Sequence, residues 1–229
     1  MTDKDLKRKL AAILSADVKD YSRLMREDEV ATIRTLTAYR EVMTTLIEQH
    51  YGRVVDSVGD NLLAEFASVV DAVQGAIAIQ KEVQTQHARL PEGRKMLFRI
   101  GINLGDLVVD GDRIYGDGVN LAARLEALAD PGGICISRTA YDQIEDKLPL
   151  GYEYLGEKTV KNTVKPVRAY KVVFDPEKDT ISVKIKTWAK QRQAKPEDLD
   201  KLNESEQTVK RHRYIIINNI RLQKHFLVY

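Results

Sequence analysis

Short apolar segments, several of them in closely spaced pairs, alternate with two long segments of helical periodicity over residues 1–175. Short apolar runs bounded by turn residues predict strands, whereas apolar residues spaced three or four apart predict one face of a helix. Strands joined by short turns pair antiparallel, and amphipathic helices bury their apolar faces against a sheet. The pattern therefore predicts an α+β domain in which one sheet is covered by helices.

The same pattern gives the expected elements. Helices are expected at Ser22–His50, Val69–His87 and Asn120–Leu128. Strands are expected at residues 9–17, 52–57, 61–66, 96–103, 106–111, 134–137, 152–156 and 167–173. The expected inward-facing residues are Val30, Ile33, Leu36, Val42, Leu46 and Ile47 in the first helix, and Ala72, Val73, Ala76, Ile79 and Val83 in the second.

The balance of charge changes near the proline of the segment Phe174–Asp179. Residues 176–229 contain twelve Lys and Arg against seven Asp and Glu, a net +5, which leaves −3 for residues 1–175. A proline inside a charged stretch is typical of a boundary. We therefore expect a folded domain at residues 1–175 and a basic C-terminal tail at residues 176–229. The tail is either a linker without its own function or a segment that docks on a partner or a membrane surface.

Composition excludes several classes of protein. The net charge of the whole chain is +2, from 36 Lys and Arg and 34 Asp and Glu, so no nucleic-acid partner is expected. The single cysteine, Cys135, excludes an internal disulfide framework. No apolar run is long enough to predict a transmembrane segment, and the first ten residues are too charged for a signal peptide. The expected setting is reducing and cytoplasmic.

Three places in the domain carry side chains suited to chemistry. Asp17 ends an apolar strand, and Asp60 lies in the turn between two others. Asn120 and Arg124 lie four residues apart, on one face of a helix. Each place also has an ordinary structural interpretation: Asp17 as a helix N-cap, Asp60 as a turn residue, and Asn120 with Arg124 as an exposed polar stripe. Together, two carboxylates at neighbouring strand ends can hold a pair of Mg²⁺ ions, and an Asn–Arg pair can orient a sugar and neutralise a phosphoryl group. The combination predicts phosphoryl transfer.

Four segments with these residues resemble the signature blocks of the class III nucleotidyl cyclase catalytic domain. They are SAD at 15–17, GDNLLAEF at 59–66, RIGINLGDLV at 99–108 and GDGVNLAARLEALADPGGICIS at 116–137, in the order and spacing of that family. The resemblance extends over residues 9–173. It implies a ferredoxin-like antiparallel sheet covered by helices, working as a head-to-tail homodimer in which both subunits contribute to each site.

The resemblance also implies a reaction and its residues. A nucleoside triphosphate, most commonly ATP, would become a 3′,5′-cyclic nucleotide and pyrophosphate, for second-messenger signalling, with two Mg²⁺ or Mn²⁺ ions per site. Asp17 and Asp60 match the two metal-binding aspartates, and the carbonyl of Val18 would be a further ligand. Asn120 matches the asparagine that positions the ribose, and Arg124 matches the arginine that stabilises charge on the α-phosphate. These two would come from the other subunit.

Two positions that would read the base depart from the adenylate-type pattern. Asp56 stands four residues before Asp60, where those members carry a lysine, and Arg113 replaces an Asp, Thr or Ser seven residues before Asn120. Asp56 can accept from guanine N1–H and N2–H₂, and Arg113 can donate to O6 and N7. Guanine or a pyrimidine therefore fits at least as well as adenine. Alternatively, Asp56 and Arg113 pair with each other across the interface and read no base, and ATP is used because it is abundant.

Two more positions concern the phosphates. Lys161 falls where the family usually has a phosphate-contacting lysine. Asp20 replaces a glycine that the family commonly has three residues after the first metal aspartate, so it adds negative charge beside the phosphates and lacks glycine's freedom in φ. This departure and the Asp56/Arg113 pair leave a second hypothesis open, a degenerate cyclase domain that binds nucleotide or dimerises without turnover.

Overall fold

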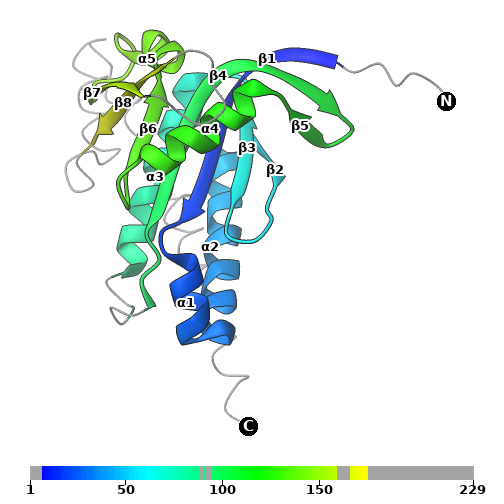
Figure 1. Cartoon of the computed structure of the whole chain (residues 1–229), viewed down its shortest axis with the longest axis vertical. Helices are drawn as coiled ribbons and strands as arrows, with labels where there is room; N and C mark the ends of the chain where they lie inside the picture. Colours follow the sequence, from blue (N-terminus) through cyan, green and yellow to red (C-terminus); the bar gives the residue numbers. More distant parts are fainter. Residues whose placement is uncertain (1–6, 88–89, 91–93, 159–165, 175–229) are drawn as a thin grey trace, which may run out of the picture. The chain divides into compact units, whose positions relative to one another are not determined.

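The computed structural model describes residues 7–87, 90, 94–158 and 166–174 (Figure 1). The chain divides into two units, Met1–Phe174 and Asp175–Tyr229. The second unit, and with it the expected tail at residues 176–229, lies outside the described residues. Within the described residues, no helix has the length and apolar character needed to cross a membrane.

One sheet with helices on both faces makes up the first unit. Its elements are β1 (Lys7–Val18), α1 (Tyr21–Glu27), α2 (Glu29–Gln49), β2 (Gly52–Asp56), β3 (Leu62–Phe66), α3 (Val69–His87), β4 (Phe98–Asp110), β5 (Arg113–Tyr115), α4 (Asp117–Leu128), β6 (Ile134–Ser137), α5 (Arg138–Ile144), β7 (Gly151–Lys158) and β8 (Val167–Val173). The strand order is β2-β3-β1-β4-β6-β8-β7, and β5 pairs with β4 outside this path. All pairings except the parallel β4–β6 pair are antiparallel. The predicted α+β class with an antiparallel sheet is confirmed.

The central strand β1 is covered on both faces. Its even-numbered residues from Ala12 to Val18 belong to the larger core, which α2 and α3 complete, whereas Ile13 belongs to a second cluster with Ala122 of α4. Figure 1 shows α4 on one side of the sheet and α2 and α3 on the other. Because successive side chains of a strand point to opposite faces, Asp17 lies on the face that α4 covers.

The single helix predicted at Ser22–His50 is two helices, α1 and α2. Asp28 has extended dihedral angles, φ −158° and ψ 91°, and separates them. Its backbone N–H donates to the carbonyl of Leu24, while its carboxylate accepts from the N–H of Ala31 at 3.0 Å. Aspartate is a favoured N-cap residue, so the second helix begins here because its free N–H groups gain a partner.

This break changes which face of the helix is buried. Val30 and Ile33 were predicted to face inward and are 58% and 46% exposed, so that prediction was wrong. The buried residues of α2 are Thr32, Leu36, Tyr39, Met43 and Ile47. By contrast, α3 has the predicted bounds, and its five predicted inward-facing residues are all buried.

The strands predicted separately at residues 96–103 and 106–111 are one strand, β4. It pairs with β1 without interruption, from Phe98 opposite Val18 to Val109 opposite Lys7. Because β1 supplies a partner along this whole length, the polar residues in the middle of β4 do not end it. The short elements β5 and α5 were not predicted. The N-cap of α5 is Ser137, whose side chain accepts from the N–H of Ala140 at 3.2 Å.

Helix α4 lies directly against the backbone of β4 at Gly101. A Cβ atom at this position would overlap the carbonyl oxygen of Ala122 and the backbone nitrogen of Glu126. The clash would be with backbone, which cannot move aside as the end of a side chain can. Only glycine therefore permits this separation of helix and strand.

We predict that Gly101→Ala lowers the free energy of unfolding by about 2–3 kcal/mol, because the added methyl group forces α4 away from β4. The matched control is Gly75→Ala in α3, where a Cβ would lie 3.4 Å from its nearest neighbour, His50 Cβ. That substitution should leave stability unchanged or raise it by up to about 1 kcal/mol, through helix propensity. Urea unfolding followed by circular dichroism measures both, and equal effects would contradict the close-contact argument.

Candidate active site

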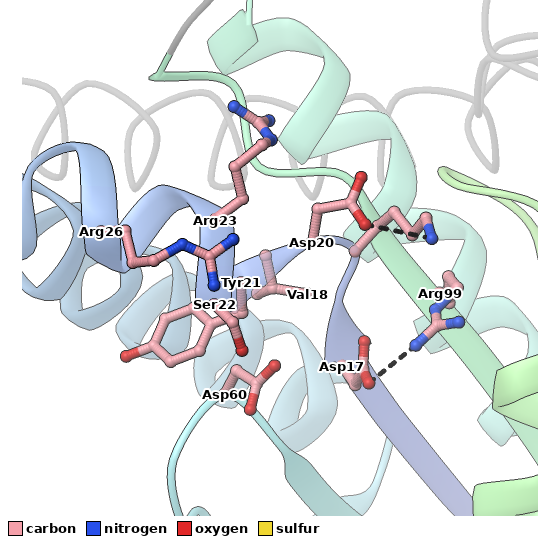
Figure 2. Close-up of a pocket in the computed structure, with 10 residues that line it drawn as sticks. Asp17, Val18, Asp20, Tyr21, Ser22, Arg23, Arg26, Asp60 and Arg99 are labelled. Carbon is pink, nitrogen blue, oxygen red and sulfur yellow. Dashed lines mark hydrogen bonds and ion pairs between the residues drawn. The ribbon is translucent and has the colours of Figure 1, made fainter.

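An open pocket of about 570 Å³ lies at the C-terminal end of β1 (Figure 2). Residues from the end of β1, the segment that follows it, α1, the β2–β3 turn and β4 line it. They are Asp17, Val18, Lys19, Asp20, Tyr21, Ser22, Arg23, Arg26, Asp60 and Arg99. Asp17 and Asp60, predicted to share a site, therefore line one pocket.

Asp17 forms an ion pair with Arg99, which stands opposite it in the β1–β4 register. Nη2 of Arg99 donates to Oδ2 of Asp17 at 2.8 Å, and both side chains are largely buried. Oδ1 of Asp17 is buried and has no hydrogen-bond partner among the described residues. Buried polar atoms nearly always have a partner, which for Asp17 is either the protonated carboxyl of Glu126 or a group that is not part of the chain. Asp17 is not a helix cap, because α1 begins after Asp20.

Asp60 lies in the turn between β2 and β3, next to Gly59, whose φ is +61°. The guanidinium of Arg40 in α2 donates to the carbonyls of Gly59 and Asn61 and so holds this turn. Burial raises the pKa of Asp60, and the negative charge of Asp17 raises it further, while Arg40 and Arg99 act in the opposite direction. The two aspartates are therefore close enough to repel each other, and a cation bound between them would relieve that repulsion.

A buried carboxylate, Glu126 of α4, lies beneath the pocket. Its Oε2 accepts from Ser15 Oγ at 2.9 Å and from Asn61 Nδ2 at 3.4 Å, and its Oε1 lies 3.7 Å from Arg99 Nη2. Ser15 precedes Asp17 by two residues on the same face of β1, and Asn61 directly follows the other pocket aspartate. These bonds join α4 to both segments that carry the aspartates.

Asp20 occupies a left-handed backbone conformation, with φ 59° and ψ 29°. Aspartate tolerates this region better than most residues, though less well than glycine. Its carboxylate forms an ion pair with Lys19 Nζ at 3.1 Å. The position therefore does require a positive φ, and Lys19 offsets the charge that the aspartate introduces.

The other predicted site residues do not line this pocket. Asn120 is exposed and Arg124 is half-buried, and both lie on α4. Lys161 lies outside the described residues. In one chain, the pocket is therefore lined by the predicted metal-binding aspartates and by Asp20, whereas Asn120 and Arg124 are not among its lining residues.

The predicted base-reading residues are exposed and lie near each other in one chain. Asp56 ends β2 and Arg113 begins β5. A hydrogen bond with Tyr115 raises the pKa of Arg113, and the charges of Tyr115 and Asp56 contribute to the same shift. Any pairing of Arg113 with Asp56 therefore does not need an interface between subunits.

Two residues of the site, Arg99 and Glu126, were not predicted. The signal for Arg99 was a charged residue inside the apolar segment FRIGIN. The signal for Glu126 was an acid four residues after the inward-facing Ala122. No group of three or more His, Cys, Asp or Glu suited to a metal occurs among the residues described. A metal site here would rest on Asp17, Asp60 and a backbone carbonyl.

We predict that Glu126→Gln stabilises the metal-free protein more at about pH 8 than at about pH 5. Burial first, and then the charge of Asp17, raise the pKa of Glu126. A carboxyl whose pKa is raised by folding contributes stability at low pH that is lost as the pH rises through the raised value, and glutamine removes this dependence. Thermal unfolding of the two proteins across this range measures the difference. A gap that is constant with pH would show that Glu126 does not titrate abnormally.

Comparison with known proteins agrees with the fold. Residues 7–173 match the adenylate and guanylate cyclase catalytic domain. A Rhizobium meliloti (strain 1021) protein provisionally named adenylate cyclase 3 is 43% identical over 171 residues, which cover 74% of this chain and 29% of that protein. The chain thus spans less than a third of the length of this relative.

Two solved structures are similar over about the same part of the chain. An adenylate/guanylate cyclase/hydrolase from Silicibacter pomeroyi is 38% identical, with a TM-score of 0.70 over 75% of this chain and 100% of that one. The adenylyl cyclase CyaB from P. aeruginosa is 27% identical, with a TM-score of 0.67 over 75% of this chain and 97% of that one. The profile match and these identities establish the relationship, and the chain belongs to the class III adenylate/guanylate cyclase family, with its catalytic domain at residues 7–173.

Proposed function

We propose that the protein is a metal-dependent cyclase that converts a nucleoside triphosphate, most commonly ATP, to a 3′,5′-cyclic nucleotide and pyrophosphate. The observation that carries this proposal is that Asp17 and Asp60 line one pocket together with Arg99. In the reaction, the ribose 3′-oxygen attacks the α-phosphorus, and the bond from that phosphorus to the leaving pyrophosphate breaks. The cyclic product would act as a second messenger, and we place the enzyme in the cytoplasm, where its substrate is found.

Asp17, Asp60 and the carbonyl of Val18 fit the binding of two Mg²⁺ or Mn²⁺ ions. The buried Oδ1 of Asp17 has no partner within the described part of the chain, and burial together with the charge of Asp17 raises the pKa of Asp60. Carboxylate and carbonyl oxygens are the ligands that these hard cations prefer. When bound, the metals would lower the pKa of the 3′-hydroxyl and neutralise phosphate charge.

The basic side chains of this pocket are suited to binding the phosphates of the substrate. Arg99 is held by Asp17 at 2.8 Å and lies 3.7 Å from Glu126, so its guanidinium is fixed before substrate enters. A positioned guanidinium binds phosphate oxygens through parallel hydrogen bonds. We assign Arg99 to the triphosphate, and Lys161 remains a second candidate for this role.

We further propose that each site is completed by a second copy of the chain, arranged head to tail. Asn120 and Arg124 lie outside the lining of the pocket that holds Asp17 and Asp60. Asn120 is exposed and Arg124 is half-buried on α4, so both are accessible to a substrate bound in the pocket of another subunit. In that arrangement, Asn120 orients the ribose and Arg124 stabilises the charge that develops on the α-phosphate.

Base choice rests on Asp56 and Arg113 in this proposal. Both are exposed, and their proximity in one chain lets them act on one base from the same subunit. Asp56 accepts hydrogen bonds and Arg113 donates them, so guanine is a fitting alternative to adenine. Pyrimidine substrates are a further alternative that the same pair permits.

We predict that the protein turns over one triphosphate in preference to the others. ATP, GTP, CTP and UTP are incubated in parallel with Mn²⁺ or Mg²⁺ at high protein concentration, and products are identified by mass. Asp17→Ala and Asp60→Ala should each abolish turnover, because each removes a metal ligand. Absence of any cyclic product from a folded, dimeric protein would instead favour the degenerate nucleotide-binding module.

We also predict that each active site is built from residues of both subunits. Asp17→Ala and Arg124→Ala should each be inactive, yet a mixture should recover about a quarter of wild-type activity, because half of randomly paired dimers keep one intact site of two. The matched control mixes Asp17→Ala with Asp60→Ala. These residues serve the same pocket, so neither site of the mixed dimer is whole and no recovery is expected. Recovery in the control, or none in the test mixture, would refute the shared arrangement.

A further inference from the structure

The charged side chains of the pocket are almost all committed to partners within the chain. Its lining holds three aspartates and four basic residues. Arg99 is paired with Asp17 at 2.8 Å, and Lys19 with Asp20 at 3.1 Å. A third basic residue, Arg23, is paired with Glu27 at 2.7 Å, one helical turn further along α1.

Arg26 is the exception. It lies in the last turn of α1, is exposed, and forms no hydrogen bond or ion pair with any described residue. Figure 2 shows its guanidinium turned toward the pocket on the side of Ser22 and Asp60, whereas the guanidinium of Arg23 points away from Asp60. A positive charge in a pocket lined by carboxylates is thus left free for a ligand.

Arg26 and Arg99 lie on opposite sides of the pocket in Figure 2, with Asp60 and Asp17 between them. A ligand that contacts both guanidinium groups must be an extended anion with negative charge along its length. A triphosphate or pyrophosphate chain has this form. The residues that we assign to the base, Asp56 and Arg113, do not line the pocket, so they do not compete with the phosphates for Arg26.

We propose that Arg26 binds the terminal phosphates of the substrate and the pyrophosphate product, an inference that rests on the proposed cyclase function. A guanidinium suits this role because its planar set of donors matches two phosphate oxygens at once. Asp20 adds a negative charge to the pocket, and its ion-pair partner is Lys19. Arg26 supplies the excess positive charge that lets a polyanion enter.

Direct binding of inorganic pyrophosphate tests the inference without requiring turnover. The dissociation constant is measured by calorimetry, with Mn²⁺ present, for wild type, Arg26→Gln, Arg26→Lys and Arg34→Gln. Arg34 is an exposed arginine of α2 outside the pocket lining, so its variant carries the same change in net charge. Arg26→Gln should bind about tenfold more weakly than wild type, Arg34→Gln should bind within about twofold of it, and Arg26→Lys should recover part of the loss.

Substrate kinetics give a second readout. Arg26→Gln should raise KM for the preferred triphosphate with little change in kcat, because a contact to the terminal phosphates stabilises bound substrate and transition state alike. The affinity for a nucleoside monophosphate, which lacks these phosphates, should be unchanged.

The outcomes separate this inference from the proposed function. Equal pyrophosphate affinities for Arg26→Gln and Arg34→Gln would overturn the role of Arg26, and so would absence of pyrophosphate binding by wild type. If Arg26→Gln loses pyrophosphate affinity while wild type turns over no triphosphate, the phosphate site stands and the cyclase activity does not. Turnover by wild type, with an unchanged KM in Arg26→Gln, would refute the role of Arg26 alone.

Discussion

The close approach of α4 to β4 at Gly101 determines the geometry beneath the pocket. Because Gly101 has no side chain, the backbone of α4 packs directly against β4, and the backbone of Glu126 occupies the position that a Cβ atom of residue 101 would take. Ser15, which stands opposite Gly101 in the register, then meets the carboxylate at 2.9 Å. A larger residue at this one position would separate the helix from β1, which carries Asp17, and from the β2–β3 turn, which carries Asp60.

The pocket combines two opposing electrostatic demands. Binding of the proposed cations requires the carboxylates of Asp17 and Asp60 to lie near each other, yet burial and the charge of Asp17 raise the pKa of Asp60. Arg99 offsets part of this cost from the opposite strand, while leaving one oxygen of Asp17 without a partner in the described structure. The site is therefore neutralised enough to be stable and still able to accept a ligand.

Much of the fold follows from local patterns in the sequence. The bounds of α3 and the antiparallel pairing of β2 with β3 were predicted, because each depends on periodicity and turns within one short segment. The break at Asp28 was missed because Val30 and Ile33 extend the helical period across it. The length of β4 was missed because a strand is also defined by its neighbour.

Some residues of the candidate site could likewise be predicted from local sequence, and others could not. Asp17 and Asp60 were predicted because one lies at the end of a recognisable strand and the other in a recognisable turn, but Arg99 and Glu126 were not. Their roles depend on strand register and on the separation of a helix from the sheet, which no single segment of sequence specifies. Lys161 stays a prediction.

The Asp17–Arg99 ion pair has a consequence for how the protein is made. A carboxylate that waits for a metal with no counter-charge would oppose folding until the ion arrived. Here an arginine from the neighbouring strand takes that place as soon as β1 and β4 pair. Folding of this part of the chain therefore does not depend on divalent cations to neutralise Asp17, and binding of the proposed metal ions would be a separate step.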